Sequence, residues 1–189
     1  MRTLILNGFH RGDSRWQQAA AILSGELKNR GWPYEEIRLC EMDIANCAGC
    51  FGCWTKTPGV CLVDDAGREV ASRFAGSDLV VFFSPVTFGG YSSELKKALD
   101  RLMPLISPFF KKIQGEVHHR RRYDRYPALI AIGMTEGDGE EQKRIFRKLL
   151  QRNVINLHHP KNADGFIAEG EDPILVREKI RGWLQEVAQ

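Results

Sequence analysis

The chain has 189 residues, of which 43% are hydrophobic and 27% are charged, and its formal net charge at pH 7 is +3. These values exclude a disordered chain and a collagen-like repeat, and a chain this long can bury a core that needs no disulfides. No apolar run reaches the ~18 residues of a membrane helix, and the first residues lack the apolar stretch of a signal peptide. We therefore expect a single cytoplasmic domain, residues 1–189, that does not bind a membrane.

Apolar runs and helical spacing alternate along the chain. Strands are predicted at residues 2–7, 34–39, 78–84 and 128–133, with a weaker fifth strand at 154–157, and helices at 14–30, 92–102, 140–152 and 173–187. Strands that alternate with helices form right-handed βαβ units and a parallel sheet covered by helices on both faces. The fold class that we expect is α/β: a flavodoxin-like, doubly wound, five-stranded parallel sheet in the order 2-1-3-4-5, which binds ligands at the carboxyl ends of its strands.

The loop at residues 8–15 leaves the first predicted strand and enters the first helix. Backbone N–H groups and the helix dipole favour an anion at such a place, and Arg11, Ser14 and Arg15 add donors suited to a phosphate. The glycine spacing matches neither G-x-G-x-x-G nor a P-loop, which argues against a dinucleotide or a nucleoside triphosphate. An ordinary turn with Ser14 as the helix N-cap is the alternative.

Two further loops follow predicted strands. Residues 84–91 combine apolar and aromatic side chains with two glycines, a composition that favours a flat wall against a planar ring. Residues 133–138 complete that ring site or cap the next helix. For both loops, ordinary core packing or capping is the alternative interpretation.

Four of the five cysteines lie within fifteen positions. Cys47, Cys50, Cys53 and Cys61 are spaced C-x2-C-x2-C-x7-C. This spacing is typical of [4Fe–4S] ligation, whereas structural zinc sites usually pair two separated C-x2-C units. Zinc and metal-free, redox-sensing thiols remain as alternatives. We expect the cysteine loop to lie at the same sheet edge as the other two loops, and Cys40 to be a buried, small apolar residue.

The predicted connection at residues 104–126 is long and basic. Residues 111–125 carry six positive and two negative side chains, a local charge of +4, so the rest of the chain has no basic excess that would indicate nucleic acid. Three interpretations of the insertion are open. It binds an acidic partner or the extra phosphate of NADPH, it packs between subunits, or it is a solvated loop. His158 and His159 are expected at the surface, and neither histidine pair has the partners of a metal site.

Taken together, the loop at 8–15, the run at 47–65, and the segment 84–96 followed by Leu99-Asp100-Arg101 resemble the NAD(P)H-dependent FMN reductase family. The cysteines resemble those of its iron–sulfur flavoprotein branch. The resemblance implies non-covalent FMN, a homodimer or tetramer, and electron transfer between NAD(P)H or a reduced protein carrier and an acceptor. The cofactor-binding residues that it implies are Phe9, His10, Arg11, Ser14, Arg15, Trp16, Pro85, Val86, Thr87, Phe88, Gly89 and Thr135, and the implied cluster ligands are Cys47, Cys50, Cys53 and Cys61.

Four of these positions depart from the family. The family often has serine at the position of Phe9, asparagine and threonine at those of Arg15 and Trp16, and tyrosine at that of Thr87. The function expected is that of an FMN-dependent oxidoreductase with a [4Fe–4S] cluster, in which the cofactor carries the redox chemistry and no side-chain acid or base is needed. The alternatives are a non-enzymatic electron carrier or redox sensor, and an NAD(P)H:FMN reductase without a cluster.

Overall fold

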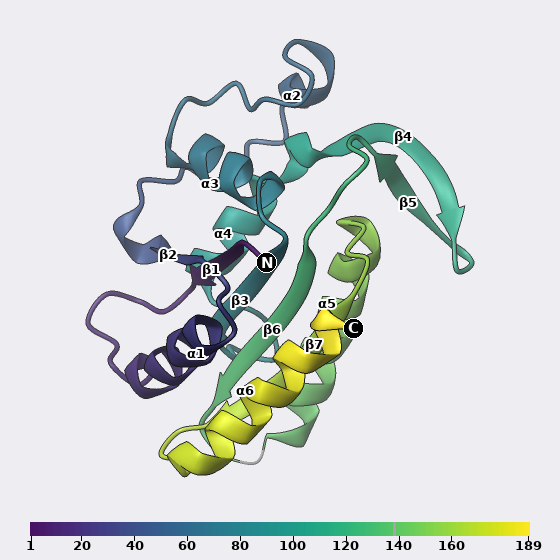
Figure 1. Ribbon diagram of the computed structural model, residues 1–189. Coiled ribbons are helices and arrows are strands. Elements are labelled where there is room, and N and C mark those ends of the chain that lie inside the picture. Colours follow the sequence, from purple (N-terminus) through teal and green to yellow (C-terminus); the bar gives the residue numbers. More distant parts are fainter. Residues whose placement is uncertain (138) are drawn as a thin grey trace.

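The computed structural model describes residues 1–137 and 139–189, and its centre is a five-stranded parallel sheet (Figure 1). The strands are β1 (Thr3–Asn7), β2 (Tyr34–Arg38), β3 (Leu79–Pro85), β6 (Ala128–Thr135) and β7 (Asn162–Ala168). They pair in the order β2-β1-β3-β6-β7. Because this order is 2-1-3-4-5 when only the sheet strands are counted, the predicted fold class is confirmed.

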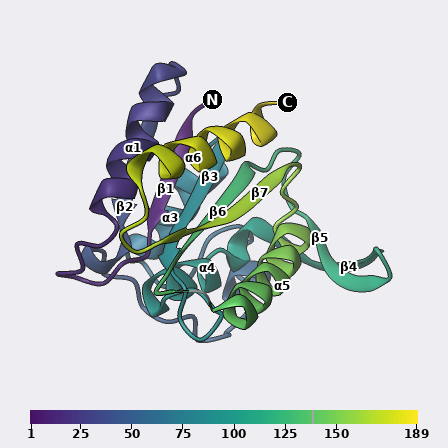
Figure 2. The ribbon, with the colours of Figure 1, turned by 90° about the horizontal axis from the view of Figure 1, so that it is seen from below.

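Helices cover both faces of the sheet, and Figure 2 shows α1 (Gln17–Asn29) and α6 (Pro173–Ala188) on one face with α4 (Ser93–Asp100) and α5 (Glu140–Asn156) on the other. The α4 side also carries α3 (Ala66–Ala75), whose Phe74 is fully buried there. Alternation along the strands divides the core: Val80 and Phe82 point to the α4 side, whereas Val81 and Phe83 point to the α1 side. Three one-turn elements complete this part, namely η1 (Leu39–Glu41), α2 (Gly52–Thr55) and η2 (Met103–Leu105).

The fifth strand lies at a different place from the one predicted. Residues 154–157 are the end and C-cap of α5, and the strand is β7. Asp164 and Gly165 interrupt the apolar pattern of β7, so the sequence does not indicate a strand there. Packing requires glycine at position 165, because a Cβ there would lie 2.0 Å from the Trp183 ring of α6. A side chain at Gly165 would therefore push α6 off the sheet. Helix α3 was not predicted.

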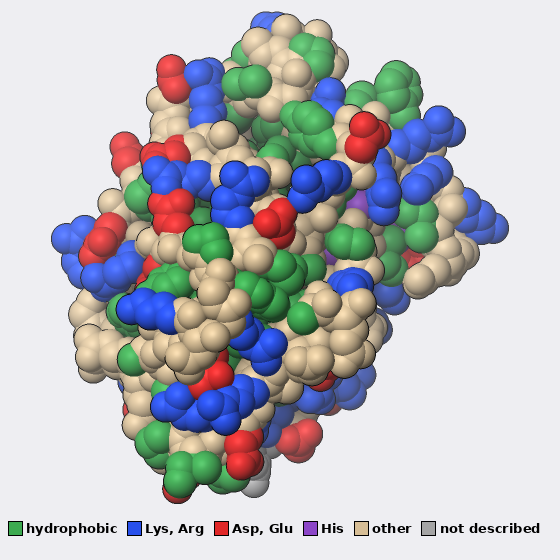
Figure 3. Space-filling model, viewed as in Figure 1, with side chains coloured by type: hydrophobic (Ala, Val, Ile, Leu, Met, Phe, Trp, Pro, Cys, Tyr) green, Lys and Arg blue, Asp and Glu red, His purple; other side chains and the backbone are tan. Residues whose placement is uncertain are grey.

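The basic insertion is a β-hairpin, not an irregular loop. Strands β4 (Ile106–Ile113) and β5 (Glu116–Arg121) pair antiparallel and project from the body of the protein (Figure 1). Phe109 and Phe110 are 69% and 56% exposed on it. Lysine and arginine side chains gather over the same region, at the upper right of Figure 3. An isolated two-stranded hairpin is only marginally stable in water, so these apolar side chains lack the cover that such a structure normally needs.

Two further expectations were wrong in detail. His158 and His159 are buried rather than at the surface, because the chain turns inward after α5 and His159 hydrogen-bonds through Nδ1 to the Pro127 carbonyl at 2.7 Å. Cys40 is half-buried in η1 rather than fully buried in β2. Across the described residues, no helix combines the length and the apolar character needed to cross a bilayer.

Candidate functional site

A pocket of about 380 Å³ opens at the carboxyl edge of the sheet, where three strand-end loops meet. Eight predicted residues line it: Phe9, His10, Arg15, Pro85, Val86, Thr87, Phe88 and Thr135. Four others, Arg11, Ser14, Trp16 and Gly89, do not line it. Of the remaining lining residues, Met134, Glu136 and Gly137 belong to the predicted loop at 133–138, whereas Gly139, Gln142 and Glu169 were not predicted; Asp138 of that loop lies outside the described residues.

One wall of the pocket is shaped by backbone contacts of the loop after β3. The Val86 amide donates to the Met134 carbonyl at 2.8 Å, and Thr87 and Gly90 exchange two backbone hydrogen bonds. This tight turn holds Phe88 at φ 50°, with 93% of its surface exposed at the rim. Behind the wall, a Cβ at Gly133 would lie 2.8 Å from a Val86 methyl. Glycine at this position therefore lets β6 and the loop after β3 approach closely, and this side of the pocket is a slot with an apolar wall formed by Pro85, Val86 and Met134.

The loop after β1 offers unused backbone donors. Within the described part of the chain, the amides of His10, Arg11 and Gly12 donate no hydrogen bond, and Gly12 has a φ of 84°. Helix α1 begins at Gln17, and no side chain caps its start, so Ser14 is not its N-cap. Arg11 is exposed and pairs with no carboxylate among the described residues. Free amides and an unpaired guanidinium before a helix are suited to an anion.

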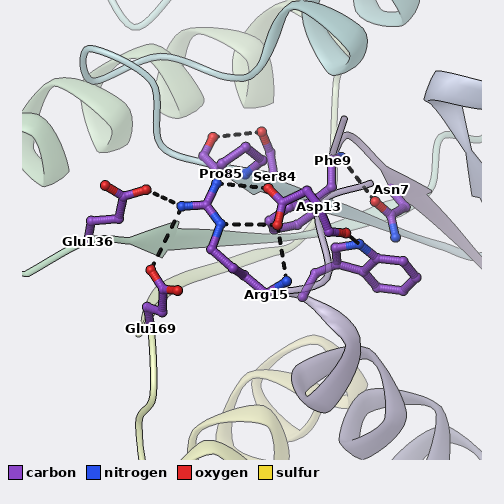
Figure 4. A network of polar contacts seen from close by, with 9 residues as sticks. Asn7, Phe9, Asp13, Arg15, Ser84, Pro85, Glu136 and Glu169 are labelled. Carbon is purple, nitrogen blue, oxygen red and sulfur yellow. Dashed lines mark hydrogen bonds and ion pairs between the residues drawn. The ribbon is translucent and has the colours of Figure 1, made fainter. Parts of the chain in front are cut away.

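Arg15, in contrast, is held by carboxylates (Figure 4). Its Nε and Nη2 donate to the two carboxylate oxygens of Asp13 at 3.0 and 2.8 Å. Nη1 pairs with Glu136 and lies 3.8 Å from Glu169, so the guanidinium links the ends of β1, β6 and β7. The hydrogen bond from Arg15 outweighs burial and keeps the pKa of Asp13 below its usual value. A phosphate at Arg15 would therefore have to displace existing partners.

These features fit FMN. The slot beside Pro85 and Val86 suits a planar ring, and the open amides at residues 10–12 suit a phosphate at the neighbouring corner. The first loop provides one anion site, which matches a mononucleotide. Nothing in this geometry demands a side-chain acid or base, because a bound flavin supplies its own redox chemistry.

The cysteine loop lies elsewhere, so the expectation of a shared sheet edge was wrong. Helix α4 runs between the two regions: its Glu94 lies 3.9 Å from His10 at the pocket, while Arg101, just past its other end, bonds to Asp65. Eight residues of helix span about 12 Å. Figure 1 accordingly shows α2 at the top, whereas β6 ends at the bottom. After β2, the chain returns along one face of the sheet, away from the carboxyl ends of the strands, before it reaches the cysteines.

The four cysteines share one neighbourhood without forming a single-ion site. Cys47 and Cys50 are exposed, whereas Cys53 and Cys61 are half-buried. Burial raises the pKa of the Cys53 thiol, and the charges of the other three thiols raise it further. Among the described residues, no three His, Cys, Asp or Glu side chains converge as ligands of one ion. A cube-shaped cluster needs sulfurs spread more widely than one ion does, and four neighbouring thiols fit that donor set.

The base of the cysteine loop is anchored to residues after α4. Trp54 Nε1 donates to the Met103 and Ile106 carbonyls at 3.1 and 3.0 Å, and Phe51 stacks on the Trp54 ring. Burial alone would raise the pKa of Asp65, but the hydrogen bonds that it accepts, led by those from Arg101, lower it overall. Burial likewise opposes the charge of Arg101, yet the hydrogen bonds and charge interactions with Asp65 and Cys61 more than offset it and raise the pKa of Arg101.

Comparisons with known proteins place the chain in a family. The family model described as NADPH-dependent FMN reductase matches residues 1–167. An iron–sulfur flavoprotein of Methanocaldococcus jannaschii is 26% identical over 141 residues, which is 75% of this chain and 66% of that protein. An iron–sulfur flavoprotein of Archaeoglobus fulgidus is 32% identical over 79 residues, which is 42% of this chain and 35% of that protein. The chain thus spans between about a third and two thirds of these relatives.

Solved structures share the fold at low identity. An NAD(P)H:quinone oxidoreductase from Methanothermobacter marburgensis superimposes with a TM-score of 0.72 at 14% identity, covering 96% of this chain and 95% of that one. An FMN-dependent NADH-azoreductase from Bacillus anthracis, solved in complex with FMN, has a TM-score of 0.67 at 16% identity over 100% of this chain and 98% of that one. The chain belongs to the NADPH-dependent FMN reductase family and has a flavodoxin-like fold.

Proposed function

We propose that this family member holds one FMN in the strand-end pocket, receives electrons from NAD(P)H or a reduced protein carrier, and passes them to an acceptor through a [4Fe–4S] cluster on Cys47, Cys50, Cys53 and Cys61. The observation that carries the proposal is the convergence of three strand-end loops on one pocket with an apolar slot and open amides. The iron–sulfur part is supported by the cysteine spacing and by the names of two relatives.

Each group of the predicted site residues, in the pocket or beside it, has a role in this proposal. Arg11, Ser14 and the amides of residues 10–12 bind the phosphate, and Phe9, His10 and Trp16 shape that corner. Pro85, Val86, Thr87 and Gly89 orient the ring, Thr135 closes the floor, and Phe88 shields the rim from water. Arg15 ties the three loops together through its carboxylates and thereby sets the pocket's width. FMN supplies hydride and single-electron chemistry when it is bound.

The proposal includes a homodimer or a tetramer of a single-domain chain in the cytoplasm. The exposed Phe109 and Phe110 side chains, surrounded by basic residues, have the composition of an interface core with a polar rim. Four free cysteines close together support a reducing compartment. Within one chain, the pocket and the cysteine loop lie at opposite ends of α4.

Anaerobic purification followed by flavin, iron and sulfide analysis tests the proposal. We expect one FMN per chain, about four irons and four sulfides per chain, and bleaching of the flavin bands by NADH or NADPH. Cys53→Ser should lose most of the iron and keep the FMN. Flavin without iron after anaerobic reconstitution would leave an FMN reductase with a thiol loop, and flavin bands that neither nicotinamide bleaches would favour an electron carrier or sensor.

A further inference from the structure

We propose that Arg101 is a positioning residue for the cysteine loop: its guanidinium clasps both ends of the loop and leaves its remaining N–H for the sulfur of Cys61. The inference rests on the proposed [4Fe–4S] site and names the side chain that prepares the loop to receive it. Arg101 follows α4 directly and reaches the loop from the sheet side.

The clasp joins segments that flank the four cysteines. Arg101 Nη1 donates to the Ala45 carbonyl at 2.8 Å and to Asp65 Oδ2 at 2.7 Å. Nη2 donates to the Val63 carbonyl at 3.2 Å and to Asp65 Oδ1 at 2.7 Å. The two-pronged pairing with Asp65 is the strong, geometrically specific form of an arginine–carboxylate contact. One side chain therefore fixes the entry and the exit of the loop at the same point.

Asp65 extends the clasp into the surrounding backbone. It accepts a hydrogen bond from the Ala45 amide at 2.9 Å, and it caps α3 by accepting from the Gly67 amide at 2.9 Å. A Cβ at Gly67 would lie 3.0 Å from the Arg101 guanidinium carbon, so α3 packs directly on the clasp. All of these partners are protein groups. The ends of the loop are thus closed by the polypeptide itself, before any metal is bound.

The third nitrogen of the Arg101 guanidinium, Nε, is not used by these contacts. Only 1% of the Arg101 side chain is exposed, and its Nε has no hydrogen-bond partner among the described residues. Buried donors are normally satisfied, so this N–H calls for an acceptor. Arg101 and Cys61 line the same cavity of about 420 Å³, whereas Cys47, Cys50 and Cys53 do not line it. A thiolate at Cys61, or a sulfide of a cluster bound there, provides that acceptor.

Such a contact has an electrochemical consequence. Hydrogen bonds to cluster sulfurs and nearby positive charge favour the reduced form, which carries one more negative charge, and so raise the reduction potential. Removing the guanidinium should lower the potential as well as loosen the loop. A purely structural role would loosen the loop without moving the potential of those clusters that still assemble.

The test compares Arg101→Lys, Arg101→Gln and Asp65→Asn with a matched control in the full chain. The control is Glu26→Gln, because Glu26 is also a buried carboxylate paired with arginines, Arg177 and Arg181, but on the opposite face of the sheet. Each protein is reconstituted anaerobically with iron and sulfide, and FMN, iron and the cluster's midpoint potential are measured. The alkylation rate of Cys61 by a maleimide is measured in the metal-free proteins.

We expect Arg101→Gln and Asp65→Asn to lose most of the iron while keeping FMN, and Arg101→Lys to keep part of the iron at a lower potential. Glu26→Gln should match the unaltered protein in iron and potential. In the metal-free state, Cys61 of Arg101→Gln should react about tenfold faster, because a loop released from its clasp opens more often. If Arg101→Gln does not fold, Arg101→Lys carries the comparison.

Two results would overturn the inference. Full iron at an unchanged potential in Arg101→Lys and Arg101→Gln would show that the clasp does not prepare the site. Unchanged Cys61 alkylation in those variants would show that it does not hold the loop. A failure of the proposed function is distinct, since there the unaltered protein itself would take up no iron, and the alkylation rates alone would then decide whether the clasp exists.

Discussion

Replacing His159 should remove much of the protein's sensitivity to mild acid. His159 is buried, its Nδ1 hydrogen-bonds to the Pro127 carbonyl, and its Nε2 has no partner among the described residues. Its ring packs against Phe74 and Phe82 at centroid distances of 5.7 and 6.3 Å. Burial, partly offset by the Pro127 carbonyl, lowers the pKa of His159 from 6.5 to about 4. The folded protein therefore excludes a proton that the unfolded chain accepts.

The sign and size of the effect follow from that difference. Above pH 6.5 both states carry a neutral imidazole, and the full stability is present. As the pH falls from 6.5 toward 4, only the unfolded chain gains the proton, so the free energy of unfolding decreases. At ~1.4 kcal/mol per pKa unit, the loss amounts to about 3 kcal/mol by pH 4. Below that pH both states are protonated, and this contribution levels off.

Urea unfolding of the FMN-free protein at pH 8, 6.5, 5 and 4 measures the effect, so that differences in FMN affinity between variants do not enter. His159→Gln keeps a donor for the Pro127 carbonyl but cannot be protonated, so its stability should vary less between pH 6.5 and 4 by about 3 kcal/mol. The control is His10→Gln, because the His10 side chain is 57% exposed; that variant should keep the steep dependence. Parallel curves for His159→Gln and the unaltered protein would refute the reasoning.

Three further predictions concern the pocket and the hairpin. Arg11→Ala should weaken FMN binding by about 1.5–3 kcal/mol, which is the range for a charged hydrogen bond. Arg15→Ala should weaken FMN binding less, because Arg15 already has carboxylate partners. Fluorescence titration with FMN compares the two variants. Gly133→Ala should cost about 1–3 kcal/mol of stability, measured by the urea midpoint, because the added methyl overpacks the ring wall. Replacing Phe109 and Phe110 together by serine should lower the mass found by light scattering, and an unaltered protein that is already monomeric would contradict the proposed assembly.

The sequence predicted the parts of the fold whose signals are local. The run Leu79–Phe83 is continuously apolar, and a strand buried on both faces requires such a run. Strand β7 was not predicted, because Asp164 and Gly165 break its apolar pattern. Gly165 is required by contact with Trp183, which lies eighteen positions away in the chain. Helix α5 extends through Val154 and Ile155, where a short apolar run at the end of a helix reads equally well as a strand. These errors arise from tertiary packing overriding local pattern.

In the candidate site, too, the residues that the sequence predicted have local signals, and those that it missed depend on contacts distant in the chain. The pocket residues after β1 and β3 were found because loops at strand ends can be located from the strands themselves. Glu169 lines the pocket just after β7, so misplacing that strand hid it. The pairing of Arg15 with Glu136 joins residues 121 positions apart, and no spacing rule indicates it. The predicted phosphate ligands therefore include one arginine that is open, Arg11, and one, Arg15, that is engaged.

Helix α4 connects these observations physically. Its first turn is capped by the Ser92 hydroxyl, which contacts the Leu95 amide at 3.2 Å, and a Cβ at Gly8 would lie 2.7 Å from that same hydroxyl oxygen. Its buried Leu95 and Ala98 fix its rotation on the sheet, and that rotation turns Arg101 inward to Asp65. The helix start thus abuts the loop that offers amides to an anion, while its end closes the cysteine loop. Because close-packed interiors transmit strain, we expect a change that moves α4 to alter both regions together.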